Sequence, residues 1–140
     1  MADVHDKKTR SYNMSQIKGK NTKPEVLVRK FLFAHGLRYR LYNKQLPGKP
    51  DIVLKKYKTV IFVQGCFWHG HQGCRYFVIP KTRTEWWVNK INGTIERDKK
   101  HQKLLMNEGW NVEVVWECEL KKDKREKTLN DLYLKIYSRR

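Results

Sequence analysis

A cluster of cysteine and histidine residues that directly follows an apolar run constrains the fold of this chain more than any other feature. The run at residues 60–63 leads into a loop in which Cys66, His71 and Cys74 have the spacing Cys-x4-His-x2-Cys. Zinc binds thiolate sulfur and imidazole nitrogen in a tetrahedron, so one loop with this spacing can supply three of its four ligands. The pattern predicts a strand that ends in a metal-binding loop.

The fourth ligand is predicted to be Cys118, the only other cysteine of the chain. Cys118 follows the apolar segment 112–116 and is expected at the end of another strand. Three cysteines and His71 would form a closed Cys3His site, and closed zinc sites are structural rather than catalytic. The alternative is a loop with unrelated cysteines and a stray histidine, but local clustering in a chain with so few cysteines favours the metal site.

Three further residues of this loop are not needed as zinc ligands. Phe67 and Trp68 are either core residues or wedges of the kind that proteins insert between DNA base steps. The neighbouring His69 can transfer protons near neutral pH. The loop is therefore a candidate for both binding and catalysis.

The charge of the chain indicates a polyanionic partner. Lys and Arg total 31 against 14 Asp and Glu, a formal net charge of +17, and aromatic residues make up 12% of the chain. Basic residues contact phosphates and aromatic residues stack on bases, so nucleic acid is favoured over a basic protein without a nucleic-acid role. Residues 1–20 are predicted to form a basic DNA-binding arm, with a frayed terminus as an equal alternative, and residues 21–140 a single domain.

Neither a signal peptide nor a membrane span is expected, because the first 25 residues and the remaining chain contain no sufficiently long apolar stretch. Three cysteines cannot all pair with one another, and metal ligation suits a reducing compartment. We expect a cytoplasmic protein.

Periodicity predicts an α/β fold. Strands are expected at residues 37–42, 51–54, 59–63 and 110–116, and helices at 22–35, at 84–91 and 94–108 with a break at Asn92-Gly93, and near 129–137. Thr22 and Thr84 are predicted to cap two of these helices.

Three acidic residues have competing interpretations. Asp51 opens a strand, where a carboxylate must be paired or bind a cation such as Mg²⁺, or else cap its own turn, and these alternatives stay open. Glu25 follows Thr22 as in a capping box, which explains it structurally. Asp98 is flanked by basic residues, so a solvated charge is the default interpretation.

The assembled motifs resemble the Vsr-type very-short-patch repair endonucleases over nearly the whole chain. They are Thr9-Arg10-Ser11 with Asn13-Met14, Leu46-Pro47-Gly48-x-Pro50-Asp51, Gly65-Cys66-Phe67-Trp68-His69, Thr82-Arg83-Thr84-Glu85, Glu96-Arg97-Asp98 and Val115-Trp116-Glu117-Cys118.

The resemblance implies a restriction-endonuclease-like mixed central sheet flanked by helices, with a structural zinc site. It implies a Mg²⁺-dependent nick on the 5′ side of the mismatched T in a T:G pair, which arises when 5-methylcytosine deaminates. The expected partner is double-stranded DNA with a T:G mismatch, with other mismatch-repair proteins as further candidates, and the expected protein is a monomer associated with the bacterial nucleoid.

The resemblance also implies roles for individual residues. Asp51 and the backbone carbonyl of Val63 would bind Mg²⁺. His69 would be the general base or proton shuttle, with Asp98 supporting the water network and Glu25 lying near the active site. The implied zinc ligands are Cys66, His71, Cys74 and Cys118. The implied DNA contacts are Met14, Phe67 and Trp68 as wedges and Trp87, Lys90 and Thr94 near the mismatched bases.

Two positions depart from the family pattern: Gln64 stands where relatives carry His or an acidic residue, and Thr94 where a relative has Asn. The alternative from a different class is a non-catalytic zinc-stapled module that binds nucleic acid. Asp51, His69 and Asp98 distinguish the two, because a binding module does not require them.

Overall fold

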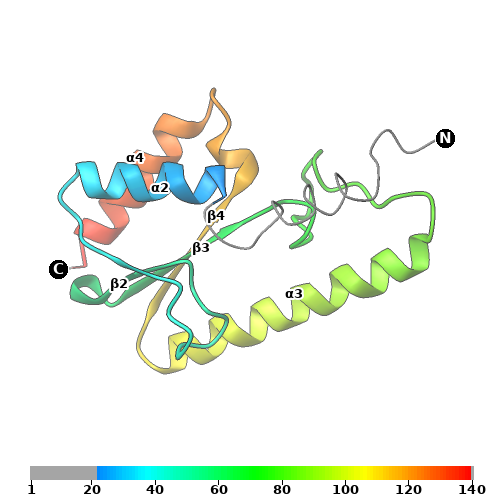
Figure 1. Cartoon of the computed structure of the whole chain (residues 1–140), viewed down its shortest axis with the longest axis horizontal. Helices are drawn as coiled ribbons and strands as arrows, with labels where there is room; N and C mark the ends of the chain where they lie inside the picture. The colour runs from blue at the N-terminus through cyan, green and yellow to red at the C-terminus, as the bar shows by residue number, and fades with distance from the viewer. Residues whose placement is uncertain (1–21, 140) are drawn as a thin grey trace, which may run out of the picture.

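The structure is a computed structural model and describes residues 22–139 (Figure 1). The predicted N-terminal arm at residues 1–20, including Met14, lies outside these residues. Among the described helices, none combines the length and the apolar character needed to cross a membrane.

A mixed four-stranded sheet forms the centre of the fold. Its strands are β1 (Arg40–Leu41), β2 (Ile52–Leu54), β3 (Thr59–Gln64) and β4 (Asn111–Trp116), and they lie in chain order across the sheet. β2 pairs with β1 and with β3 in antiparallel orientation, whereas β4 pairs with β3 in parallel. The prediction of a mixed sheet in an α/β fold is therefore confirmed.

Helices cover both faces of the sheet (Figure 1). The helices α2 (Lys23–Ala34) and α4 (Arg125–Tyr137) lie on one face, and α3 (Thr84–Asn107) crosses the other. Two short 3-10 turns, Lys55–Tyr57 and Glu117–Leu120, follow β2 and β4. Because β3 and β4 run in parallel, their carboxyl ends place the loops at residues 65–83 and 117–124 side by side.

Two apolar clusters hold these layers together. The larger one joins α2 and α4 to the sheet, and its fully buried members are Val28, Leu32, Ile52, Leu54, Ile61 and Ile136. The smaller one joins α3 to the opposite face through Val53, Val60, Phe62 and Leu105. Burial of such side chains contributes about 1.5–3 kcal/mol each.

The predicted cap of the first helix is confirmed. Thr22 has extended backbone angles, and its Oγ1 accepts a hydrogen bond from the Glu25 N–H at 3.4 Å. Pro24 occupies the first turn, where its missing N–H leaves no bond unmade.

The predicted break at Asn92-Gly93 is wrong, because α3 is continuous over 24 residues. Glycine in a helix interior costs about 1 kcal/mol relative to alanine but does not end the helix when neighbouring turns are packed. Ile91 and Leu105 are buried on either side of Gly93. Thr84 is also not the cap: Arg83 is, and the Thr84 hydroxyl donates to backbone carbonyls of the preceding turn.

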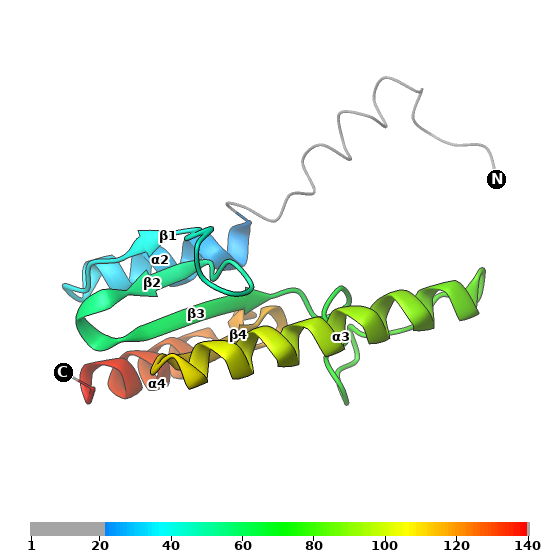
Figure 2. The ribbon, with the colours of Figure 1, turned by 90° about the horizontal axis from the view of Figure 1, so that it is seen from below.

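The predicted first strand is shorter than expected, since only Arg40–Leu41 pair with β2. Tyr42 ends it with a positive φ of 50°, outside the β region. The amino-terminal half of α3 extends past the ends of β3 and β4, beside the loop at residues 65–83 (Figure 2).

Candidate active site and metal centre

Asp51 lies directly before β2 and faces the end of β3. Its Oδ2 accepts a hydrogen bond from the Val63 N–H at 2.7 Å. Burial raises the pKa of Asp51 from 3.8 to about 7; the Val63 hydrogen bond and the nearby His69 act in the opposite direction, whereas Glu25 adds to the increase. The alternative of a turn aspartate that caps its own backbone is not what the structure shows, because the partner lies on another strand.

Glu25 is the second acidic residue near this point. Its backbone serves the helix cap, but its side chain is buried, with 3% of the residue exposed. The carboxylate accepts a hydrogen bond from the Tyr42 hydroxyl. Glu25 is thus more than a capping residue, because its carboxylate lies close enough to Asp51 to influence it electrostatically.

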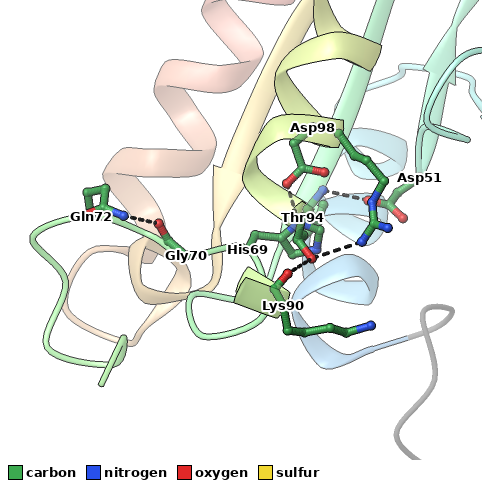
Figure 3. A network of polar contacts seen from close by, with 9 residues as sticks. Asp51, His69, Gly70, Gln72, Lys90, Thr94 and Asp98 are labelled. Carbon is green, nitrogen blue, oxygen red and sulfur yellow. Dashed lines mark hydrogen bonds and ion pairs between the residues drawn. The ribbon is translucent and has the colours of Figure 1, made fainter. Parts of the chain in front are cut away.

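His69 and Asp98 form a hydrogen-bonded pair between the loop after β3 and the middle of α3. His69 Nδ1 and Asp98 Oδ2 are 2.7 Å apart, with side-chain exposures of 32% and 23%. Figure 3 shows the two side chains facing each other, with Asp51 close by. A carboxylate accepts hydrogen bonds, so Nδ1 carries the proton and Nε2 is left as a base. Asp98 is therefore not the solvated charge that its basic neighbours suggest.

One cleft of about 630 Å³ brings these groups together. Its wall from the sheet and α2 includes Glu25, Asp51, Val63 and Gln64, and its wall from α3 includes Asp98, His101 and Gln102. Trp68 and His69 line it from the loop.

Gly48 allows the turn before Asp51 to pack against α3. It has a φ of +75°, and a Cβ at this position would lie 2.9 Å from the Cβ of His101. Only glycine combines the left-handed backbone with so close an approach. The contact sets the distance between the Asp51 turn and the helix that carries Asp98.

The four predicted zinc ligands lie close together. Three of them belong to the loop at residues 65–83, and Cys118 follows β4. One ligand atom each from Cys66, His71, Cys74 and Cys118 falls within 4.8 Å of all the others, and Cys118 Sγ is 3.5 Å from His71 Nδ1. The His71 ring stacks on Trp116 with centroids 4.0 Å apart. Three thiols and one imidazole are the donor set that zinc prefers, so the cluster could hold this metal.

Local hydrogen bonds shape this cluster. Cys66 Sγ accepts from the Cys118 N–H at 3.3 Å, and the Cys66 carbonyl accepts from the His71 N–H at 2.9 Å. Burial raises the pKa of the Cys66 thiol to about 12. This thiol therefore keeps its proton without metal, and metal binding must release it.

The aromatic residues of the loop form a cluster with the start of α3. The Phe67 ring meets Trp68 and Trp87 edge-on, with centroids 5.2 and 5.3 Å away. Trp68 is 49% exposed, whereas Phe67 and Trp87 are partly buried. Trp68 beside the cleft is thus held by Phe67 and Trp87, and Trp87 also packs edge-on against the exposed Trp86.

Lys90 and Thr94 lie one helical turn apart on α3 (Figure 3). The Thr94 hydroxyl donates to the Lys90 carbonyl at 3.2 Å and accepts from Arg97 at 3.3 Å. Lys90 is exposed. These contacts place polar and basic groups on the helix surface near the aromatic cluster.

The structure brings most of the predicted site residues together, and it adds two that sequence reasoning did not assign. Tyr42 contacts both Glu25 and Asp51. The sequence pattern indicated only that it is the last residue of a strand with alternating apolar and polar residues. The helical spacing of His101 and Asp98 in the sequence indicates that they lie on the same face of α3. The spacing alone does not indicate that His101 lines the cleft.

Comparisons with known proteins find similarity to DNA endonucleases. The family model of the DNA mismatch endonuclease Vsr matches residues 2–75. The chain is 54% identical over 121 residues to the type II nicking enzyme V.NmeAIP of Neisseria meningitidis, with 86% of each protein covered. It is 47% identical to the DNA mismatch endonuclease Vsr of Escherichia coli K12, covering 86% of this chain and 77% of that protein.

Proposed function

The chain belongs to the Vsr family of DNA mismatch endonucleases, and from this premise we propose that it nicks one strand of a DNA duplex on the 5′ side of the mismatched T in a T:G pair. Such pairs arise when 5-methylcytosine deaminates. The observation that carries the proposal is the cleft where Asp51 meets the His69–Asp98 pair beside an exposed tryptophan. A binding module without catalysis does not fit a chain whose relatives are endonucleases.

Asp51 is proposed to bind Mg²⁺ together with the backbone carbonyl of Val63. Hard cations prefer oxygen ligands, and a buried carboxylate is costly to ionise unless a cation or donor stabilises it. The raised pKa of Asp51 and the nearby Glu25 carboxylate are the features expected of residues that bind a cation. When bound, Mg²⁺ would neutralise charge on the attacked phosphate and on the leaving oxygen.

His69 is proposed to accept the proton of the attacking water. Its hydrogen bond to Asp98 fixes the ring so that Nε2 is the free base, and this bond also stabilises the imidazolium that forms. Asp98 holds the ring and does not itself take the proton. Because His69 and Trp68 are adjacent in the chain, the base lies beside the residue proposed to sense the mismatch.

The proposed recognition combines the basic surface with the aromatic cluster. The net charge of +17 supplies attraction to any duplex. Phe67 and Trp68 would enter the base stack at the mismatch, with Trp87, Lys90 and Thr94 beside the mismatched bases. A T:G pair stacks and deforms differently from T:A, so insertion costs less there. We further propose that the protein is a monomer. We also propose a restriction-endonuclease-like fold, which is supported by the mixed sheet and by the position of Asp51 directly before β2.

A strand-labelled nicking assay tests this function. Duplexes that differ only in one pair, T:G, T:A or another mismatch, are incubated with the protein in Mg²⁺ or in EDTA. The proposal expects one nick, in the T strand of the T:G duplex, only with Mg²⁺. Equal nicking of the T:A duplex, or full nicking in EDTA, would overturn it.

Replacing Trp68 by alanine should weaken discrimination more than affinity. The exposed ring contributes about 1–3 kcal/mol of stacking per base, so preference for T:G over T:A should fall by roughly 5- to 150-fold. Binding titrations on both duplexes measure this. Phe33→Ala is the control, because Phe33 is an exposed aromatic residue on α2, outside the cleft. Equal loss of affinity for both duplexes would indicate general stacking instead.

Replacing Cys118 by serine should remove zinc and destabilise the fold. We propose that Cys66, His71, Cys74 and Cys118 hold one structural Zn²⁺, and structural zinc contributes directly to folding free energy. A loss of about 2–3 kcal/mol would lower the melting temperature by roughly 5–10 °C. Metal analysis and melting curves provide the measurement, with Gln72→Ala as a control in the same loop. Full zinc retention with unchanged melting would exclude Cys118 from the site.

A further inference from the structure

Tyr42 has a backbone conformation that a large side chain rarely adopts. Its φ of +50° lies in the left-handed region, at the point where β1 ends and the loop toward Asp51 begins. Strain of this kind persists only where surrounding contacts hold it. The contacts that hold Tyr42 in this conformation therefore indicate its structural role.

Two hydrogen bonds connect Tyr42 to the acidic residues of the cleft. Its backbone N–H donates to the Asp51 carbonyl at 3.2 Å, one residue beyond the β1–β2 pairing. Its hydroxyl donates to Glu25 Oε2 on the neighbouring helix. Tyr42 is not among the residues that line the cleft, and these two hydrogen bonds connect it to residues that do.

Glu25 and Asp51 need such a support because both carboxylates lie in the same cleft. Two anions at close range repel each other, and the effect of Glu25 on Asp51 shows that they interact. Glu25 is almost fully buried, so its carboxylate needs donors to stay in place. The Tyr42 hydroxyl is one of these donors.

We propose that Tyr42 is a positioning residue for the cation site, holding the Glu25 carboxylate beside Asp51 so that both face the same bound cation and its water shell. The inference rests on the proposed Mg²⁺-dependent hydrolysis and extends the site beyond the residues assigned above. The hydrogen bonds of Tyr42 go to Glu25 and to the Asp51 carbonyl, so we expect it to govern cation affinity rather than proton transfer at His69.

Replacing Tyr42 by phenylalanine tests this role, because it removes one hydroxyl and keeps the ring. Outer partners of metal ligands typically contribute 10–100-fold in affinity or activity. The Mg²⁺ concentration for half-maximal single-turnover nicking of the T:G duplex should rise by about 10-fold, while the rate at saturating Mg²⁺ stays within about 3-fold of the parent. Tyr39→Phe is the matched control, since Tyr39 packs against the core on the same segment.

Calorimetric titration of the DNA-free protein with Mg²⁺ gives a second readout that needs no activity. Tyr42→Phe should bind Mg²⁺ about 10-fold more weakly than the parent and Tyr39→Phe equally well. Glu25→Ala and the double variant Tyr42→Phe with Glu25→Ala should have the same affinity, because Tyr42 acts through the Glu25 carboxylate. Melting curves show whether each variant is folded.

Three results would overturn the inference: unchanged Mg²⁺ affinity in Tyr42→Phe, additive losses in the double variant, or a lower saturated rate without a shift in Mg²⁺ dependence. A parent protein that binds Mg²⁺ but nicks no duplex would contradict the proposed function instead, and the calorimetric comparison would still decide the role of Tyr42.

Discussion

Asp51→Ala is expected to abolish Mg²⁺-dependent nicking of a T:G duplex while the protein stays folded and still binds the mismatch. Asp51 is the side chain proposed above to bind the cation, and its hydrogen bond from the Val63 N–H fixes it at the end of β3. Binding rests on other groups, namely the basic surface and the aromatic cluster. Loss of one anion near a phosphate can even tighten binding slightly, because it lowers local repulsion. Single-turnover nicking beside a binding titration measures both effects.

The melting temperature of Asp51→Ala, compared with that of the parent, shows whether the variant is folded. Burial raises the pKa of Asp51 from 3.8 to about 7, so the folded protein holds this proton more tightly than the unfolded chain does. Its contribution to stability is complete below pH 3.8 and is lost as the pH rises through 7. Without Mg²⁺ at about pH 8, the variant should therefore melt at the same temperature as the parent or higher. A folded variant that nicks at the parent rate would show that Asp51 is not the cation ligand.

The metal cluster illustrates what local sequence patterns can predict. Cys66, His71 and Cys74 are close in the chain, so their spacing alone restricts the geometry of the loop. Cys118 could be added because it follows an apolar segment, and parallel pairing of β3 with β4 does place the two strand ends together. The prediction needed only short-range spacing and one long-range pairing of strands.

Asp98 shows why charge patterns along the chain mislead. Its sequence neighbours are basic, which suggested a solvated carboxylate, but residues adjacent on a helix point in different directions. The turn of α3 directs Asp98 to His69 and leaves Lys99 and Lys100 exposed. The family resemblance assigned Asp98 to the active site, whereas the basic residues next to it in the sequence suggested an exposed, solvated carboxylate.

Tyr42 could not be predicted because its role depends on tertiary contacts and an unusual backbone. Its hydroxyl reaches a residue 17 positions earlier in the chain, on a different element. Its left-handed conformation has no sequence signal, since glycine and asparagine are the residues that mark such positions. The continuity of α3 through Gly93 escaped prediction for a related reason, because packing on either side outweighed local propensity.

His69→Ala is expected to slow nicking by about 10²- to 10⁴-fold at saturating Mg²⁺, with mismatch binding largely retained. The reason is that the His69–Asp98 pair presents a free Nε2 to the cleft. Some activity should survive, because charge neutralisation at the phosphate does not depend on the imidazole. Single-turnover rates of the T:G duplex at saturating protein measure the effect, and added imidazole should partly restore the rate by entering the space that the ring leaves.

A second histidine variant identifies which imidazole is the base. His101 lines the same cleft from the next turn of α3, but no hydrogen bond to a carboxylate holds its ring among the described residues. His101→Ala should therefore slow nicking far less than His69→Ala, and imidazole should not improve it. Asp98→Asn should also produce a large loss, because the amide neither fixes the tautomer of the ring nor stabilises its charged form. If His101→Ala were the slower variant and His69→Ala nicked near the parent rate, the proton acceptor would be His101, and the role of the Asp98 contact would be to hold the aromatic loop against α3.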